Sequence, residues 1–147
     1  MNPNASKAMK QYAQVGTRTG IEDATPHRLV QMLMEGALDR IAAAKGHMSR
    51  GETARKGEYI GLAISIIDGL RAALDKEAGG EIAQNLEGLY DYMCRRLLEA
   101  NLNDDVGILD EVGRLMGAIK TAWDAIAEQP EAAVRRVAAA AGEVAGR

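Results

Sequence analysis

The chain has 147 residues, of which 47% are hydrophobic, and a formal net charge of -3. This length supports one domain with its own core and is too short for two. The charges of both signs are mixed throughout and lack the basic footprint of nucleic-acid-binding domains, so we expect no nucleic-acid partner. The single cysteine, Cys94, cannot form an internal disulfide and fits a reducing compartment.

Neither a signal peptide nor a membrane span is predicted. The N-terminal stretch MNPNASKAMKQYAQVG has no apolar core of signal-peptide length. No apolar run in the chain approaches the ~18 residues that a membrane-spanning helix needs. We therefore expect a soluble protein of the cytoplasm.

Four segments carry a helical pattern, and no segment alternates with the period of a β-strand. Thr25 and Pro26 supply an N-cap followed by proline at the first helical position, which predicts a helix start. Breakers then follow in GHMSRGETA, in KEAGGE and in NLNDD, where Asn103 or Asp104 can cap the last helix. The expected helices therefore cover about 25–45, 53–75, 81–100 and 104–127.

Four helices of about 20 residues with short connections predict an all-α fold, an antiparallel up-down four-helix bundle. We expect the bundle to occupy residues 21–128. Residues 1–20 are mostly polar and are expected to form a flexible N-terminal arm. Pro130 stops the fourth helix, and residues 129–147 are rich in alanine, so a weakly helical or disordered C-terminal tail is expected there.

Each helix has one apolar seam for the core, and Leu74, Ile82 and Trp123 belong to the seams of the second, third and fourth helices. The first two helices carry a second apolar row as well. Tyr90 belongs to the seam of the third helix, whereas Tyr92 falls well off it. Tyr92 either covers the flank of the bundle with a solvated hydroxyl or contacts a partner. One buried stripe is enough for a bundle helix, so we expect something else to cover the second rows. These rows are Met34 and Leu38 in the first helix, and Tyr59, Leu62, Ile66 and Ala73 in the second.

Seven glycines lie inside the expected helices, where each costs about 1 kcal/mol relative to alanine. They are either tolerated on the surface or they allow another backbone to approach closely, and the sequence leaves both interpretations open. The seven are Gly36, Gly57, Gly61, Gly69, Gly88, Gly113 and Gly117.

Catalytic and metal-binding patterns are missing from the sequence. His27 and His47 are the only histidines, and neither stands in the Glu-x-x-His pair of di-iron bundles. Cys94 has no cysteine or histidine at metal-ligand spacing, and the pair Asp104 and Asp105 suits helix capping. We expect no metal, no cofactor and no enzymatic activity, and we expect solvent around His27.

Several stretches resemble the flagellin-specific export chaperone family, FliS. They are GGEIAQNLEGLYDYMCRRLLEANLNDD at 79–105, ATPHRLVQMLMEGAL at 24–38, QYAQVG at 11–16 and AWDAI at 122–126. Together they extend over about residues 12–126 and touch every expected helix. The chain departs from the family pattern at Met34 and Glu35, where the family usually has an aromatic residue and an aspartate, so no aromatic contact to a client is expected there.

The resemblance implies a cytoplasmic chaperone that binds the C-terminal segment of flagellin, about one to one. It would prevent premature polymerisation and present the segment to an export-gate component of the flagellar type III apparatus. Such a client, disordered alone and helical in the filament, would be bound as a helix in an apolar groove. The expected flagellin-binding residues are Tyr12, Val15, Met34, Leu38, Tyr59, Leu62, Ile66 and Tyr92.

The arm has an expected role of its own. Met9, Tyr12 and Val15 are spaced three apart and would share one side of a helical turn. We expect this patch to fold back over the second rows, near Tyr92, when no client is bound. Family members carry a tyrosine in the matching Tyr-Ala-Gln-Val stretch, and this part of the family is implicated in client binding.

Two other functions remain open on the sequence. In the first, the second rows form a homodimer, and the chain is a self-associating bundle without a flagellin client. In the second, His27 accepts a phosphoryl group on a phosphotransfer bundle.

Overall fold

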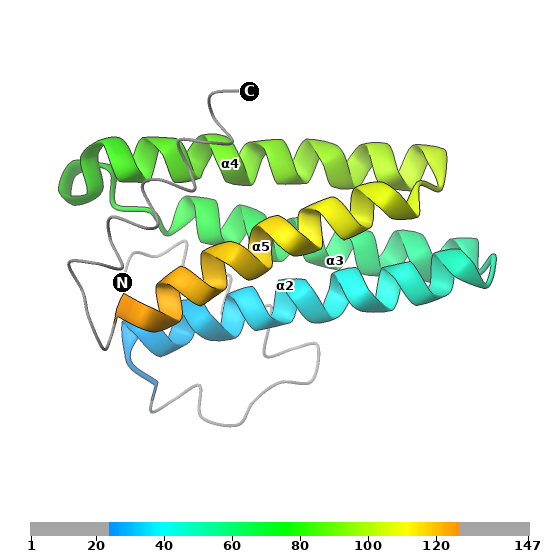
Figure 1. Ribbon diagram of the computed structural model, residues 1–147, viewed down its shortest axis with the longest axis horizontal. Helices are drawn as coiled ribbons and strands as arrows, with labels where there is room; N and C mark the ends of the chain where they lie inside the picture. The colour runs from blue at the N-terminus through cyan, green and yellow to red at the C-terminus, as the bar shows by residue number, and fades with distance from the viewer. Residues whose placement is uncertain (1–23, 127–147) are drawn as a thin grey trace.

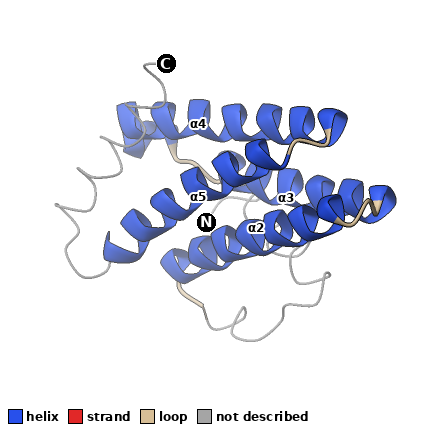
Figure 2. Cartoon of the chain, turned by 45° about the vertical axis from the view of Figure 1, so that its right-hand side comes forward, coloured by secondary structure: helices blue, strands red, loops and turns tan. Residues whose placement is uncertain are grey.

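The computed structural model describes residues 24–126, which form four helices: α2 (Pro26–Ser49), α3 (Thr53–Ala72), α4 (Lys76–Asn103) and α5 (Val106–Ile126). Short loops join them, and these residues contain no strand (Figure 2). The predicted all-α fold is confirmed. The predicted N-terminal arm and C-terminal tail lie outside the described residues.

The helices run alternately up and down, as Figure 1 shows. Each packs against its neighbours in the chain, and α5 returns to pack against α2, which closes the ring. This is the antiparallel up-down bundle that the sequence predicts. As a consequence, the first turn of α2, the last turn of α3, the start of α4 and the last turn of α5 meet at one end of the bundle.

An N-cap residue explains where α2 begins, and the turn between α2 and α3 explains where it ends. The hydroxyl oxygen of Thr25 accepts a hydrogen bond from the backbone N–H of Arg28 at 3.1 Å, as expected for the predicted N-cap. The helix continues to Ser49, four residues beyond the predicted end. The turn comes at Gly51, whose φ of 72° suits glycine and few other residues.

The turn from α3 to α4 contains a break that the sequence predicts in part. α3 ends at Ala72, and the carboxylate of Asp75 accepts a hydrogen bond from the N–H of Ala78 at 3.0 Å. One short helical turn follows until Gly80, whose φ of 52° interrupts the helix. The long part of α4 thus begins at Glu81, as predicted, but residues 76–79 form a capped turn of their own.

The cap at the start of α5 lies one residue later in the chain than predicted. Asp104 has a left-handed backbone, with φ of 50°, and ends α4. The carboxylate of Asp105, not Asn103 or Asp104, accepts the hydrogen bond from the N–H of Ile108 at 3.3 Å.

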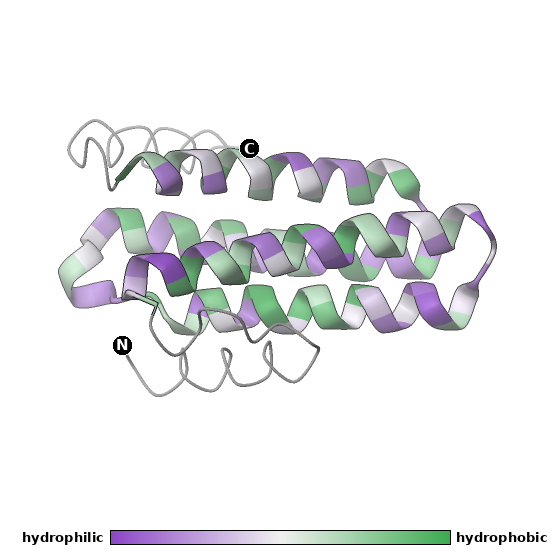
Figure 3. Ribbon diagram, turned by 90° about the horizontal axis from the view of Figure 1, so that it is seen from below, coloured by the Kyte–Doolittle hydropathy of each residue, from purple (hydrophilic) through white to green (hydrophobic). Residues whose placement is uncertain are grey.

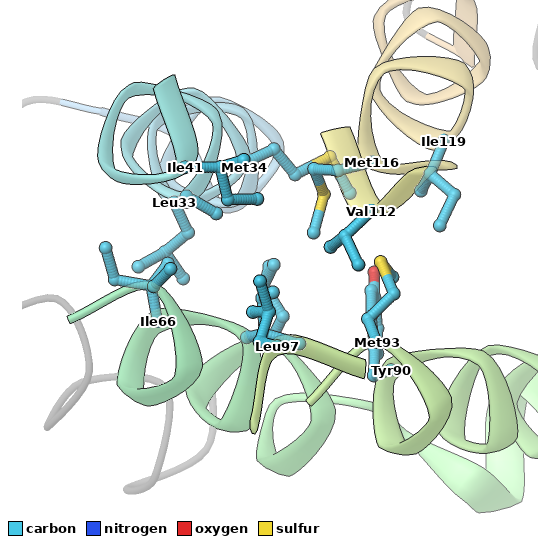
Figure 4. Close-up of a cluster of buried hydrophobic side chains, with 14 of the residues drawn as sticks. Leu33, Met34, Ile41, Ile66, Tyr90, Met93, Leu97, Val112, Met116 and Ile119 are labelled. Atoms are coloured by element: carbon cyan, nitrogen blue, oxygen red, sulfur yellow. The ribbon is translucent and has the colours of Figure 1, made fainter. Parts of the chain in front are cut away.

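Apolar side chains from all four helices meet along the axis of the bundle (Figure 4). Hydrophobic and hydrophilic residues alternate along each helix, as the green and purple bands of Figure 3 show. Tyr90 lies in this core at 3% exposure, as predicted, and burial raises the pKa of its hydroxyl.

The predicted second rows are wrong for two residues. Met34 is 1% exposed and Ile66 is 6% exposed, so both belong to the core. Figure 4 shows Ile66 of α3 and Leu33 of α2 pointing toward each other. Because α2 and α3 bury broad stripes against each other, positions beside the main seam are also removed from water. Leu38, Tyr59, Leu62 and Ala73 are half-buried.

A buried lysine stabilises the end of the bundle where α3 begins and α4 ends. Lys56 of α3 is 4% exposed. Its ammonium donates to the backbone oxygen of Asn101 at 2.9 Å and to the carboxylate of Asp104 at 2.5 Å. The two acceptors offset the cost of burying the charge, and they tie α3 to the turn between α4 and α5. Sequence periodicity did not single out this residue.

The corrected core assignment predicts that Ile66→Asp unfolds the bundle, as Ile67→Asp does, because each variant buries an unpaired charge. Leu62→Asp should cost much less because Leu62 is half-buried. Thermal melts followed by circular dichroism check this. A stable Ile66→Asp variant with a melting temperature near that of Leu62→Asp would contradict the assignment.

Candidate functional site

An apolar cavity of about 480 Å³ opens at the end of the bundle where α2 begins and α5 ends. All four helices contribute to it, and we call it the end cavity. Asp75 is the only charged residue among the described residues that line it, so these walls offer apolar surface almost throughout. The lining residues are Val30, Met34, Leu70, Ala73, Leu74, Asp75, Ala78, Gly79, Ile82, Ala83, Leu86, Tyr90, Ile119, Trp123 and Ile126.

The local sequence explains why the cavity exists. α3 stops at Ala72, and Gly80 bends the chain away from the straight path of α4. The segment between them contributes the small residues Ala73, Ala78 and Gly79 to the wall, together with Leu74 and Asp75. Among residues 24–126, the apolar stripes of the helices therefore reach this end with a space left between them.

Trp123 holds α5 to the start of α2 beside the end cavity. Its indole N–H donates to the backbone oxygen of His27 at 3.0 Å. The ring of His27 stacks on the indole, with centroids 4.9 Å apart and planes 8° from parallel. His27 is therefore half-buried and not fully solvated as expected. Its Nε2 is buried and has no hydrogen-bond partner among the described residues.

A polar link supports the same junction. The Gln31 amide of α2 donates to the Asp124 carboxylate of α5 at 2.7 Å, and the Lys120 ammonium reaches the other oxygen at 2.7 Å. Burial acts to raise the pKa of Asp124, but the hydrogen bonds from Lys120 and Gln31 outweigh it and hold the pKa below its usual value. Asp124 thus stays ionised and keeps the two helix ends together.

The end cavity contains only one of the flagellin-binding residues predicted from the sequence. Met34 lines it, whereas Ile66 is in the core and Leu38 and Leu62 are half-buried outside the lining. Tyr59 is half-buried, and its ring stacks on His47 with centroids 5.2 Å apart. Tyr12 and Val15 lie outside the described residues.

Tyr92 covers the flank between α4 and α5. Its hydroxyl donates to one carboxylate oxygen of Glu111 at 2.9 Å, and the guanidinium of Arg96 donates to the other at 2.8 Å. Burial acts to raise the pKa of Glu111, yet the hydrogen bonds from Arg96 and Tyr92 lower it overall. Of the two interpretations of Tyr92, flank cover fits this geometry, with Glu111 as the partner of the hydroxyl.

Cys94 is half-buried between α4 and α3. Its sulfur lies 3.9 Å from the backbone oxygen of Ile64 and 3.8 Å from the carboxylate of Asp68. Burial and, secondarily, the negative charge of Asp68 raise the pKa of the thiol to about 12. A thiol of this kind is a poor nucleophile near neutral pH.

Sequence reasoning missed the end cavity because it assigned its walls to the closed core. Leu74, Ile82 and Trp123 follow the core seams and are, in fact, half-buried around an open space. The glycine pair at 79–80 could have indicated the cavity. Glycines beside the ends of apolar helices bring no side chain to pack against the last turns of those helices.

Two further properties concern residues 24–126 alone. No helix in this part of the chain is both long and apolar enough to cross a membrane. In the same residues, no three side chains of histidine, cysteine, aspartate or glutamate gather where they could hold a metal ion.

Comparison with known proteins agrees with this architecture. A family profile described as "Flagellar protein FliS" matches residues 8–130. A flagellar secretion chaperone FliSB of Pseudomonas aeruginosa is 54% identical over 122 residues, which cover 83% of this chain and 97% of the relative. Flagellar secretion chaperones FliS of Salmonella typhimurium and Bacillus subtilis are 46% and 33% identical, over 82% and 72% of this chain and 90% and 78% of theirs. The chain belongs to the FliS family.

Proposed function

We propose that this protein is a cytoplasmic export chaperone that binds the C-terminal segment of flagellin in and around the end cavity. It keeps the segment from polymerising and presents it to the flagellar type III export apparatus. The relatives named above are flagellar secretion chaperones, and a family of chaperones is not a family of enzymes. The single observation that carries the proposal is the end cavity, an apolar space of about 480 Å³ formed by all four helices.

The chemistry of the end cavity suits an amphipathic helix. Its walls are aliphatic and aromatic, and the one carboxylate, Asp75, stands in the turn between α3 and α4. A client helix that lays its apolar face there removes these walls from water, at about 25 cal/mol for each Å² of apolar surface buried. A flagellin segment without its filament neighbours has an apolar face of this kind to cover.

The binding surface extends beyond the end cavity in this proposal. Leu38, Tyr59 and Leu62 are half-buried on α2 and α3 and remain candidates for contact with the client. Tyr12 and Val15 of the arm remain candidates as well. Met34 contributes through the cavity wall. Ile66 supports the client surface from the core, and Tyr92 contributes by its ring edge while its hydroxyl is held by Glu111.

The two other functions have less support. A homodimer through the second rows would need Met34 and Ile66 on the surface, and both are buried. A phosphotransfer role for His27 has less support because its ring stacks on Trp123 and its Nε2 is buried.

The first prediction is one-to-one binding of a flagellin C-terminal peptide, with a negative heat-capacity change from apolar burial. Trp123 is the only tryptophan and lines the end cavity, so its fluorescence emission should shift to the blue as the peptide excludes water. Titration calorimetry and emission spectra with a tryptophan-free peptide measure both effects. Heat without any change in emission would place the peptide away from the end cavity.

The second prediction compares two aspartate variants. Ile82→Asp puts a charge on the wall of the end cavity and should weaken peptide binding at least tenfold, about 1.4 kcal/mol, because the client would bury that charge unpaired. Leu98→Asp is the matched control, since Leu98 is 53% exposed and is not among the lining residues. Equal affinities for the two variants, both folded by circular dichroism, would refute the assignment of the site.

The third prediction concerns the arm. Removing residues 1–16 should leave the bundle folded, because the four helices of residues 24–126 bury a core among themselves. The affinity for the peptide should rise if the arm only competes with the client, and fall if Tyr12 also contacts it. Calorimetry on the truncated chain and on Tyr12→Ala measures the change. An unchanged affinity in both would leave the arm without a part in binding.

A further inference from the structure

The C-terminal tail, residues 129–147, carries an apolar stripe at helical spacing in its sequence. Pro130 and Glu131 together make a helix-start signal, a proline followed by an acidic residue in the first turn. Arg136, Glu143 and Arg147 fall on one face at about 100° per residue. Five apolar residues recur on the opposite face, at the spacings of an amphipathic helix. The five are Val134, Val137, Ala138, Ala141 and Val144.

A helix of this sequence is marginal by itself. Alanine favours the helix, but two glycines, Gly142 and Gly146, and the three valines disfavour it. Isolated helices of about 15 residues are barely stable in water even when alanine dominates. The tail therefore gains a stable helix only by packing its apolar stripe against another apolar surface.

The end cavity is the apolar surface next to the point where the tail begins. Ile126 is the last residue of α5 and one of the lining residues of the cavity. Residues 127–130 span at most about 14 Å, so the stripe starts close to the opening. A connection this short gives a tethered segment an effective concentration on the order of millimolar at a nearby site. Weak intrinsic binding is then enough for the tail to occupy the cavity.

We propose that the tail packs as a helix into the end cavity and covers it when no client is bound. The wall of the cavity carries large side chains, among them Leu74, Ile82 and Trp123, whereas the stripe of the tail carries only alanine and valine. Small residues that face large ones let two apolar surfaces interdigitate. The charged face of the tail, with Arg136 and Glu143, stays in water in this arrangement.

The covering tail regulates the site to which the flagellin segment is assigned above, because tail and client cannot both fill the same space. This competition rests on the proposed function, whereas the docking of the tail does not. The family match ends at residue 130. The cover thus comes from residues beyond the part of the chain that the family profile describes.

The test of docking uses the fluorescence of Trp123, the only tryptophan of the chain. Removing residues 130–147 should shift its emission to the red, because water then reaches the indole at the cavity wall. A peptide of residues 130–147, which contains no tryptophan, should reverse the shift at millimolar concentration, since it replaces a tethered segment. Circular dichroism checks that the shortened chain is folded.

Two aspartate variants of the full-length chain are matched, two residues apart on opposite faces of the tail. Val137→Asp puts a charge on the apolar stripe and should shift the emission to the red as removal of the tail does, because docking would bury that charge unpaired. Ala139→Asp puts the same charge on the solvated face and should leave the emission unchanged. Equal emission for the two variants would overturn the proposal.

The test of competition uses the flagellin C-terminal peptide. Removing residues 130–147 should tighten its binding at least threefold, the effect expected when the tail leaves the cavity open in about one molecule in three. The blue shift that the peptide causes should also be larger in the shortened chain, because the tail already excludes part of the water from Trp123 in the full chain.

The outcomes separate this proposal from the proposed function. Flagellin binding with the same affinity and the same Trp123 emission in both chains would overturn the covering tail and leave the chaperone function standing. A red shift on removal of the tail, reversed by the tail peptide, would support docking even if no flagellin peptide bound. An emission that responds to removal of residues 1–16, or to protein concentration, but not to removal of the tail would assign the cover to the arm or to a second copy and overturn the proposal.

Discussion

Burial of one apolar stripe from each of four antiparallel helices is the constraint on which the structure depends. The stripes are long enough to fill the axis of the bundle with leucine, isoleucine and methionine. They also continue into the last turns at one end, where the turn between α3 and α4 lines an opening with small residues such as Ala78 and Gly79 beside Leu74 and Asp75. The core and the end cavity are thus two parts of one apolar surface, one closed by the four helices and one that residues 24–126 leave open.

Different polar interactions stabilise the two ends of the bundle. At the far end, the buried Lys56 satisfies its charge on Asp104 and a backbone oxygen of α4. At the cavity end, Trp123 donates to His27 and Asp124 accepts from Gln31. These contacts hold α2 and α5 together beside the opening, so the cavity walls keep their positions without a client inside.

The two faces of α4 differ in exposure. Its inner face gives Leu86 and Tyr90 to the core and the end cavity, and its outer face carries the exposed side chains of Leu98 and Leu102.

The sequence by itself determined the class of fold and the family. Helical periodicity, the cap at Thr25 and the breaks near Gly51 and Gly80 are local, so they could be recognised without knowing what packs against what. The number of helices, their alternation and the core position of Tyr90 followed from them. The resemblance in stretches spread over every helix was equally independent of packing.

Only the tertiary structure decided which apolar residues are covered. Met34 and Ile66 looked external on a single helix and are buried because α2 and α3 pack over broad stripes, while Ile82 and Trp123 looked internal and border an open cavity. Lys56 is buried because α3 brings it to Asp104, 48 residues later in the chain. A periodic pattern shows which direction a side chain faces on its own helix, but burial depends on where the other helices end.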